Sequence, residues 1–120
     1  MTEAILCLAI AIFNESKGEP TKGQYAVAEV IHNRSNHSDY PNSYCGVVKQ
    51  KGQFSWYKGS QSLKPPKHEN KAWDESLKVA KNFSTKKTNY TKGSLYFNHQ
   101  RLGVRFGKSL KCKIGNHVFF

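Results

Sequence analysis

The segment EAILCLAIAIFNESKG, residues 3–18, sets the architecture expected for the rest of the chain. Every residue from 4 to 13 is apolar, so a helix here presents apolar side chains around its circumference and packs on several sides. Polar residues then begin at Asn14, and Gly18 can adopt the left-handed conformation that often ends a helix. We therefore expect a buried helix over 3–14, with Glu15 placed where this helix meets an opening.

Further helices are expected along the next part of the chain. Thr21 and Gln24 have the spacing of a capping box, and apolar residues at helical spacing continue from there to about Arg34. A second helical stripe covers residues 69–83. A short helix is expected between them, with Pro41 in its first turn and three inward-facing residues, Cys45, Val47 and Val48. Residues 52–62 are rich in Gly, Ser and aromatic residues, which predicts a loop.

The pattern changes to β beyond Gly93. Two short aromatic segments, 95–97 and 118–120, are typical of strands, and a basic connection, residues 100–113, separates them. Helices followed by a small sheet or hairpin make an α+β arrangement. A chain of 120 residues has the length of one domain, which we place at 1–120.

The charge of the chain favours anionic partners without selecting one. Nineteen Lys and Arg against eight Asp and Glu give a formal net charge of +11. Nucleic acid, an anionic membrane surface and a bacterial envelope all suit this sign. The lysines are scattered and form no basic tail, so charge alone identifies none of the three.

The cysteines bear on the redox state of the protein, and the N-terminal segment bears on its export. Cys7, Cys45 and Cys112 are odd in number and show no CxxC or Cys/His pairing, so free thiols are expected, with neither a disulfide framework nor a zinc site. No metal or cofactor is predicted. The apolar run has Glu3 where a signal peptide carries basic residues, and it is too short to cross a bilayer. We expect synthesis in the cytoplasm without a signal peptide and no transmembrane segment.

Two carboxylates are candidates for acid–base chemistry. Breaking a glycosidic bond requires a carboxylic acid that stays protonated near neutral pH, and burial against apolar surface favours that form. Glu15 follows the apolar helix and suits this role. Glu19, beside Lys17 and Lys22, is expected to be ionised and to bind backbone N–H groups at the start of the second helix. The alternative is that both are ordinary surface carboxylates.

Aromatic and amide side chains occur together in two places, as sugar binding requires. One is the loop at residues 53–57, and the other is the segment at residues 96–99. The same aromatic residues could equally belong to the core. His117, close to the C-terminal aromatics, is expected to be a hydrogen-bonded scaffold residue.

Several motifs, in order along nearly the whole chain, resemble one family. The chain reads NESKGEP at 14–20, GQ at 23–24, AVA at 26–28, VI at 30–31 and NR at 33–34. It continues with YP at 40–41, GVV at 46–48, QFS at 53–55, GSLYF at 93–97 and IGNHVF at 114–119. These segments resemble the spore-cortex-lytic and cell wall hydrolase family, which typically reads NEARGEP, GQ, AVA and VxNR. The chain departs from the pattern at Lys17, at Phe120 and in lacking the family's tryptophan before the last motif.

The resemblance implies a lysozyme-like fold of the lytic transglycosylase kind, mainly helical with a small sheet toward the C-terminus. It implies cleavage between N-acetylmuramic acid and N-acetylglucosamine, with Glu15 as the catalytic glutamate. The expected substrate-binding residues are Glu19, Gln24, Gln53, Phe54, Ser55, Tyr96, Asn98 and His117. The partners that follow are peptidoglycan glycan strands and the anionic cell envelope, with no nucleic acid, and we expect a monomer.

The reaction favoured is that of a lytic transglycosylase, which leaves 1,6-anhydro-muramic ends, because no second carboxylate stands in a motif that suggests a role. A hydrolytic muramidase acting on the same bond is the alternative. A small basic metal-dependent nuclease and a non-catalytic wall-binding module are further hypotheses. The protein is expected to act at the bacterial cell wall, delivered by a phage or released by another route.

Overall fold

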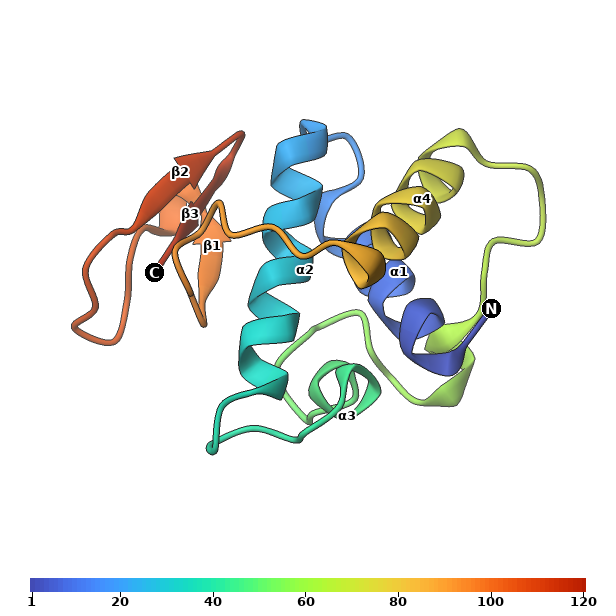
Figure 1. The fold of residues 1–120 in the computed structure, drawn as a ribbon, viewed down its shortest axis with the longest axis horizontal. Coiled ribbons are helices and arrows are strands. Elements are labelled where there is room, and N and C mark those ends of the chain that lie inside the picture. The colour runs from blue at the N-terminus through green and yellow to red at the C-terminus, as the bar shows by residue number, and fades with distance from the viewer.

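The computed structural model describes residues 1–120 and contains four α-helices, two 3-10 turns and a three-stranded sheet. In Figure 1 α2 (Thr21–Ser35) stands in the middle, with α1 (Glu3–Ser16) and α4 (Lys71–Thr85) on one side and the sheet on the other. The short α3 (Tyr44–Val48) lies near the C-terminal end of α2. The 3-10 turns are Ser60–Leu63 and Gln100–Leu102. This is the expected α+β arrangement.

Helix α1 is the centre of the helical part. All six residues from Cys7 to Ile12 are buried, and the helix contacts α2, α3 and α4, as the apolar run predicted. Thr2 caps its start by accepting from the backbone N–H of Ile5. The helix extends to Ser16, past the expected end at residue 14, and Glu15 therefore lies within its last turn. No helix of the chain combines the length and the apolar character that crossing a bilayer would need.

Helix α2 has apolar residues on two faces because it separates the helical core from the sheet. Val27 and Ile31 belong to the helical core, whereas Ala26 and Val30 pack with Ile114 and other residues of the sheet. The predicted bounds are confirmed, but the predicted capping box is wrong, since Pro20 holds the cap position and no side chain caps the helix.

Glu75 of α4 explains why the capping box does not form. The Thr21 hydroxyl donates to Glu75 Oε1 at 3.2 Å, and Gln24 Nε2 donates to the same oxygen at 2.8 Å. Both side chains that a capping box would use are therefore directed toward α4. The interaction joins residues more than 50 positions apart, which local spacing does not report.

Helix α3 begins later than expected and is fixed to α1 by a disulfide. Ser43 caps α3 by accepting from the Gly46 N–H, so Pro41 precedes the helix and is not part of its first turn. Cys45 forms a disulfide with Cys7 of α1, across a Cα separation of 5.3 Å. The expectation of three free thiols is thus wrong for two of the cysteines, and Cys112 is the free one.

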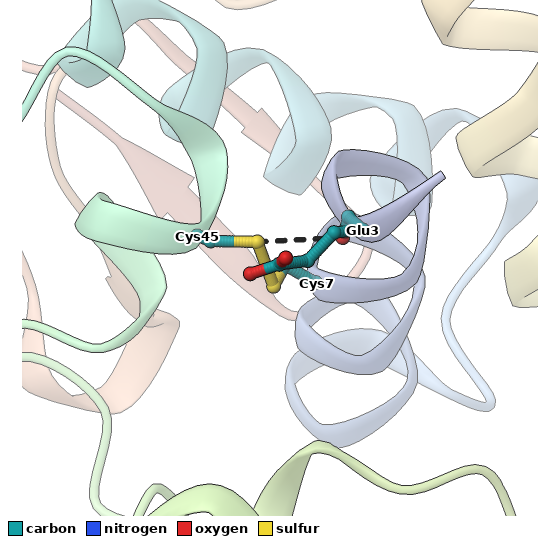
Figure 2. Close-up of side chains that lie close together, drawn as sticks. All are labelled: Glu3, Cys7 and Cys45. Atoms are coloured by element: carbon teal, nitrogen blue, oxygen red, sulfur yellow. Dashed lines mark hydrogen bonds between the residues drawn. A yellow bond between two sulfur atoms is a disulfide. The ribbon is translucent and has the colours of Figure 1, made fainter. Parts of the chain in front are cut away.

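The disulfide also settles the chemistry of a small cluster near the N-terminus. Figure 2 shows Glu3 beside the bonded sulfurs, with Cys45 Sγ 3.3 Å from the Glu3 carbonyl oxygen. A carboxylate and two thiolates would make a set of metal ligands, but thiolates are the ligating form and both sulfurs are bonded to each other. We therefore interpret this cluster as a link between helices.

The C-terminal part confirms the β pattern and adds a strand. The sheet has the order β1-β3-β2, built from β1 (Phe97–His99), β2 (Cys112–Ile114) and β3 (His117–Phe119), all antiparallel. The expected strands at 95–97 and 118–120 are each displaced toward residues 97–99 and 117–119. Strand β2 lies within the segment that we expected to be mostly connection, because its charged residue Lys113 faces solvent and interrupts the apolar pattern.

Glu29 is a buried carboxylate that joins α2 to the segment before the sheet. It is 1% exposed and accepts from the Thr88 hydroxyl, the Tyr90 N–H, and both the N–H and the hydroxyl of Thr91. Four donors for two oxygens satisfy the group, as burial of a carboxylate requires. Its role is structural, and it holds residues 88–91 against α2.

The disulfide leads to the first prediction. The Cys7→Ser/Cys45→Ser variant should lose about 4 kcal/mol of unfolding free energy, because the bond closes a loop between residues 38 positions apart. Denaturant unfolding of the variant and of the parent protein, with and without dithiothreitol, measures the loss. Cys112→Ser is the matched control and should retain the parent's stability and its response to reduction. Alkylation of three thiols in the unreduced, unfolded parent protein would contradict the assignment.

Candidate active site

Glu15 lies half-buried in the last turn of α1, and the aromatic loop holds its carboxyl group in place. Trp56 Nε1 donates a hydrogen bond of 2.9 Å to Glu15 Oε2. The indole is itself fixed by Phe54, whose buried ring stacks on it with a centroid distance of 5.7 Å. The loop at 53–57, predicted as a sugar-stacking segment, thus also orients the carboxyl group of Glu15.

Burial raises the pKa of Glu15 above its ordinary value, and this effect outweighs two opposing ones. The hydrogen bond from Trp56 and the positive charge of Arg34 each lower the pKa of Glu15, because both favour the ionised form. The net direction agrees with the expectation from the apolar run of α1. A larger fraction of Glu15 is therefore protonated near neutral pH than for an exposed glutamate.

Arg34, at the end of α2, is the charged group that acts on the pKa of Glu15. Its side chain is 6% exposed, and its Nε donates to the Leu95 carbonyl at 2.7 Å. Nη1 donates to Gln53 Oε1 at 3.3 Å. The guanidinium lies 5.3 Å from the ring centroid of Tyr40 and 5.8 Å from that of Tyr96. Arg34 takes part in none of the three ion pairs of the chain, so this buried cation has no protein carboxylate as partner.

A hollow of about 380 Å³ opens beside the Arg34 guanidinium, between the end of α2 and the sheet. Arg34, Tyr40, Gln53, Tyr96 and Asn98 are among the residues that line it. Burial and a hydrogen bond with Tyr96 raise the pKa of Tyr40, so the Tyr40 phenol lines the hollow as a neutral group. Glu15 does not line the hollow. Arg34 does, and its charge also acts on the pKa of Glu15.

Three of the predicted site residues, Gln53, Tyr96 and Asn98, line the hollow. Glu15 lies outside it, and Arg34, whose charge acts on the pKa of Glu15, is among the lining residues. Asn98 Nδ2 donates to the Gly103 carbonyl at 3.0 Å, which fixes the start of the loop that borders the hollow. The remaining predicted residues lie elsewhere.

Glu19 and His117 lie together at the junction of the α1–α2 turn and the sheet. The Glu19 carboxylate accepts from the Asn116 backbone N–H at 2.7 Å and from Asn116 Nδ2 at 3.0 Å. It therefore binds the β2–β3 turn, and the expectation that it binds the start of the second helix is wrong. Gly115 is required in this turn, because its φ is +58° and a Cβ would lie 2.5 Å from Glu19 Oε1.

His117 packs at the same junction without the hydrogen bond that we expected of it. Its Nδ1 has no hydrogen-bond partner and lies 3.9 Å from Glu19 Oε1. Burial lowers the pKa of His117. Its ring contacts those of Phe97 and Phe119, which makes it a packing residue of the sheet.

The other three predicted residues also do not line the hollow. Gln24 is 2% exposed, and its amide donates to Glu75 and to the Glu19 carbonyl. Phe54 is 5% exposed and belongs to the helical core, where it supports Trp56. Ser55 is exposed and makes no hydrogen bond with the other site residues.

Among the site residues that were not predicted from the sequence are its two arginines, Arg34 and Arg105. Arg34 follows Val27 and Ile31 at helical spacing, on the apolar face of α2. This position of a cation on an inward-facing stripe was the signal in the sequence that could have identified it. Arg105 gave no signal beyond its place in a basic segment. Both line the hollow.

Comparison with known proteins identifies the family of this arrangement. The model of the family described as Cell Wall Hydrolase matches residues 18–120, a range that begins after Glu15. The spore cortex-lytic enzyme of Bacillus subtilis (strain 168) is 50% identical over 44 residues, which are 37% of this chain and 14% of that protein. The spore cortex-lytic enzyme of Bacillus cereus is 43% identical over 51 residues, which are 42% of this chain and 20% of that protein. The matched segments thus span a small part of each relative.

Solved structures match over nearly the whole chain. The catalytic domain of the germination-specific lytic transglycosylase SleB from Bacillus anthracis has a TM-score of 0.77 and 28% identity, covering 99% of this chain and 95% of that one. The catalytic domain of the Bacillus cereus SleB protein has a TM-score of 0.68 and 25% identity, covering 97% and 88%. The expected fold of the lytic transglycosylase kind is confirmed.

The contact between Trp56 and Glu15 leads to a prediction about proton affinity. In the parent protein the hydrogen bond from the indole N–H of Trp56 lowers the pKa of Glu15. Trp56→Phe keeps an aromatic ring to stack on Phe54 but removes this donor. The pKa of Glu15 should therefore rise further in the variant. Carbon-detected NMR titration of the side-chain carboxyl groups measures it, with Tyr57→Phe as the control that leaves this hydrogen bond in place. An unchanged or lowered pKa in Trp56→Phe would show that the indole does not favour the ionised form.

Proposed function

The chain belongs to the cell wall hydrolase family, and on this premise we propose that it cleaves the glycan strands of bacterial peptidoglycan with Glu15 as the acid. The observation that carries the proposal is a carboxyl group with a raised pKa, held by Trp56 at the end of a buried helix and influenced by Arg34, which lines an aromatic-walled hollow. The similar Bacillus anthracis domain belongs to a germination-specific lytic transglycosylase, which supports the same chemistry.

In the proposed reaction, Glu15 protonates the oxygen that bridges N-acetylmuramic acid and N-acetylglucosamine. The bond between this oxygen and the anomeric carbon breaks as positive charge develops on the muramic ring. The 6-hydroxyl of the same ring then attacks the anomeric carbon and returns its proton to Glu15. One C–O bond breaks and another forms, so the product is a 1,6-anhydro-muramic end and no water is consumed.

The distribution of the other carboxylates supports this route over hydrolysis. A hydrolytic muramidase would use a second carboxylate to activate water or to attack the sugar. Glu19, Glu29 and Glu75 are each engaged in hydrogen bonds that join elements of the fold. The remaining acidic side chains, Glu3, Asp39, Glu69 and Asp74, are exposed, and none of them contributes to the pKa of Glu15.

We place the site of action at the cell wall. The formal charge of +11 supports attraction to an anionic envelope. The nuclease hypothesis gains no support, because His32 lies on α2 with Nδ1 2.8 Å from the Tyr44 hydroxyl and its ring against Phe83.

Replacing the acid tests the proposal directly. Glu15→Gln should slow the clearing of purified sacculi by about 100-fold or more, because it removes general acid catalysis while retaining the shape of the side chain. Turbidity loss measures the rate, and sedimentation with sacculi measures binding, which should persist. Glu69→Gln, at an exposed carboxylate, is the control and should clear walls at the parent rate. Full-speed clearing by Glu15→Gln would refute the assigned role, and no clearing by the parent protein would leave a wall-binding module as the better hypothesis.

The nature of the released ends is a separate prediction. Mass spectrometry of digested sacculi should find muramic ends that are lighter by one water than reducing ends, because the 6-hydroxyl replaces water as the nucleophile. A hydrolytic lysozyme digest of the same sacculi supplies the reference for hydrated ends. If this protein releases predominantly hydrated ends, the transglycosylase assignment is wrong and the protein is a muramidase acting on the same bond.

A further inference from the structure

The guanidinium of Arg34 forms no ion pair within the protein, and the Glu15 carboxylate acts on its charge only from beyond ion-pair distance. Removing such a group from water is costly unless its charge and its donors are satisfied. Arg34 is 6% exposed, yet its protein partners are a carbonyl and an amide oxygen, neither of which is charged. These bonds use Nε and Nη1 and leave Nη2 without a protein acceptor. The side chain lines the hollow, where a ligand can reach these free donors.

Further cations surround the same space. Arg105 also lines the hollow of about 380 Å³. An adjoining hollow of about 170 Å³ shares Tyr96 and Phe120 with the first and is lined by Lys108 and Lys111. No acidic residue lines either hollow. Four cations and no acidic side chain make a surface complementary to an anion. The net charge alone, scattered over the chain, did not indicate such a surface.

The loop that carries Arg105 is built against the hollow. Asn98 holds its start through the Gly103 carbonyl, and the ring of Phe106 lies 5.2 Å from that of Tyr96. Phe106 has a φ of 61° and is 72% exposed, so an apolar side chain remains open to solvent in a conformation that L-residues rarely adopt. Backbone conformations of this kind cluster at ligand-binding segments. The loop thus borders the hollow with an aromatic face and a cation.

We propose that Arg34 and Arg105 bind a carboxylate of the glycan substrate. Within peptidoglycan this carboxylate is the lactyl group of muramic acid or, where a stem peptide acylates that group, a carboxylate of the peptide. A guanidinium binds a carboxylate through two parallel N–H bonds, which fixes its orientation. The aromatic walls supply faces for the sugar ring next to it. The inference rests on the proposed function and adds to it a charged group that the enzyme recognises.

The inference predicts that the enzyme distinguishes charged from neutral strands. The substrates are glycan strands with free lactyl carboxylates, strands with stem peptides, and both kinds after conversion of their carboxylates to amides. The parent protein should have a kcat/KM about tenfold or more higher on a carboxylate strand than on its amide, the effect of one charge-assisted hydrogen bond. If only one of the two kinds of strand is cleaved faster than its own amide, that kind identifies the carboxylate as lactyl or as peptide.

Two variants assign the preference to the named residues. Arg105→Gln should lose about tenfold in kcat/KM on carboxylate strands, mainly through KM, and should no longer distinguish them from amides. Arg101→Gln removes an exposed cation of the same basic segment that lines neither hollow, and it should behave as the parent. Arg34→Lys keeps the positive charge but loses the paired N–H donors of the guanidinium, so it should reduce the preference for carboxylate strands. Thermal unfolding of this variant tests whether it is still folded.

The outcomes separate this inference from the proposed function. Cleavage that is equally fast on carboxylate and amide strands overturns the subsite and leaves the proposed function intact. A preference that survives Arg105→Gln, or one that is lost in Arg101→Gln, also overturns the assignment. If no strand of any kind is cleaved by the parent protein, the proposed function itself fails.

Discussion

The burial of α1 on several sides places its last turn, and with it Glu15, against the interior. Cys7 to Ile12 are buried by α2, α3 and α4, and the disulfide from Cys7 fixes α3 to the same helix. A carboxyl group at the end of such a helix loses part of its contact with water. The position of Glu15 in the fold is therefore also the cause of its raised pKa.

Helix α2 connects this helical core with the sheet. One of its faces packs on α1 and α4, and the other packs on Ile114 and Phe119 of the sheet. Glu29 and Glu19 secure the two sides of this junction, the first through residues 88–91 and the second through the β2–β3 turn. Arg34 emerges at the end of α2 between the two parts, and so it reaches both the surroundings of Glu15 and the hollow beside the sheet.

The sequence predicted what depends on neighbouring residues and missed what depends on packing. The helices, the approximate strands and the place of Glu15 follow from periodicity and from the abrupt end of an apolar run. The disulfide was missed because Cys7 and Cys45 are 38 positions apart, and their spacing does not report that α3 lies on α1. The capping box failed because Glu75, from another helix, binds both of its side chains. Arg34 was not predicted as a site residue because its significance comes from being buried beside the hollow without an ion-pair partner, which is a property of the assembled fold.

The opposing influences on Glu15 suit a group that must both release and recover a proton. Burial favours the protonated carboxyl group, whereas the Trp56 N–H and the Arg34 charge favour the carboxylate. An acid that was only buried would hold its proton strongly, and its ionised form would be left without partners. Here the carboxylate that remains after proton donation finds a hydrogen bond already in place and a cation near enough to favour its charge. In the proposed reaction Glu15 alternates between these forms within one cycle, so an environment that serves both is more useful than one that raises the pKa as far as burial allows.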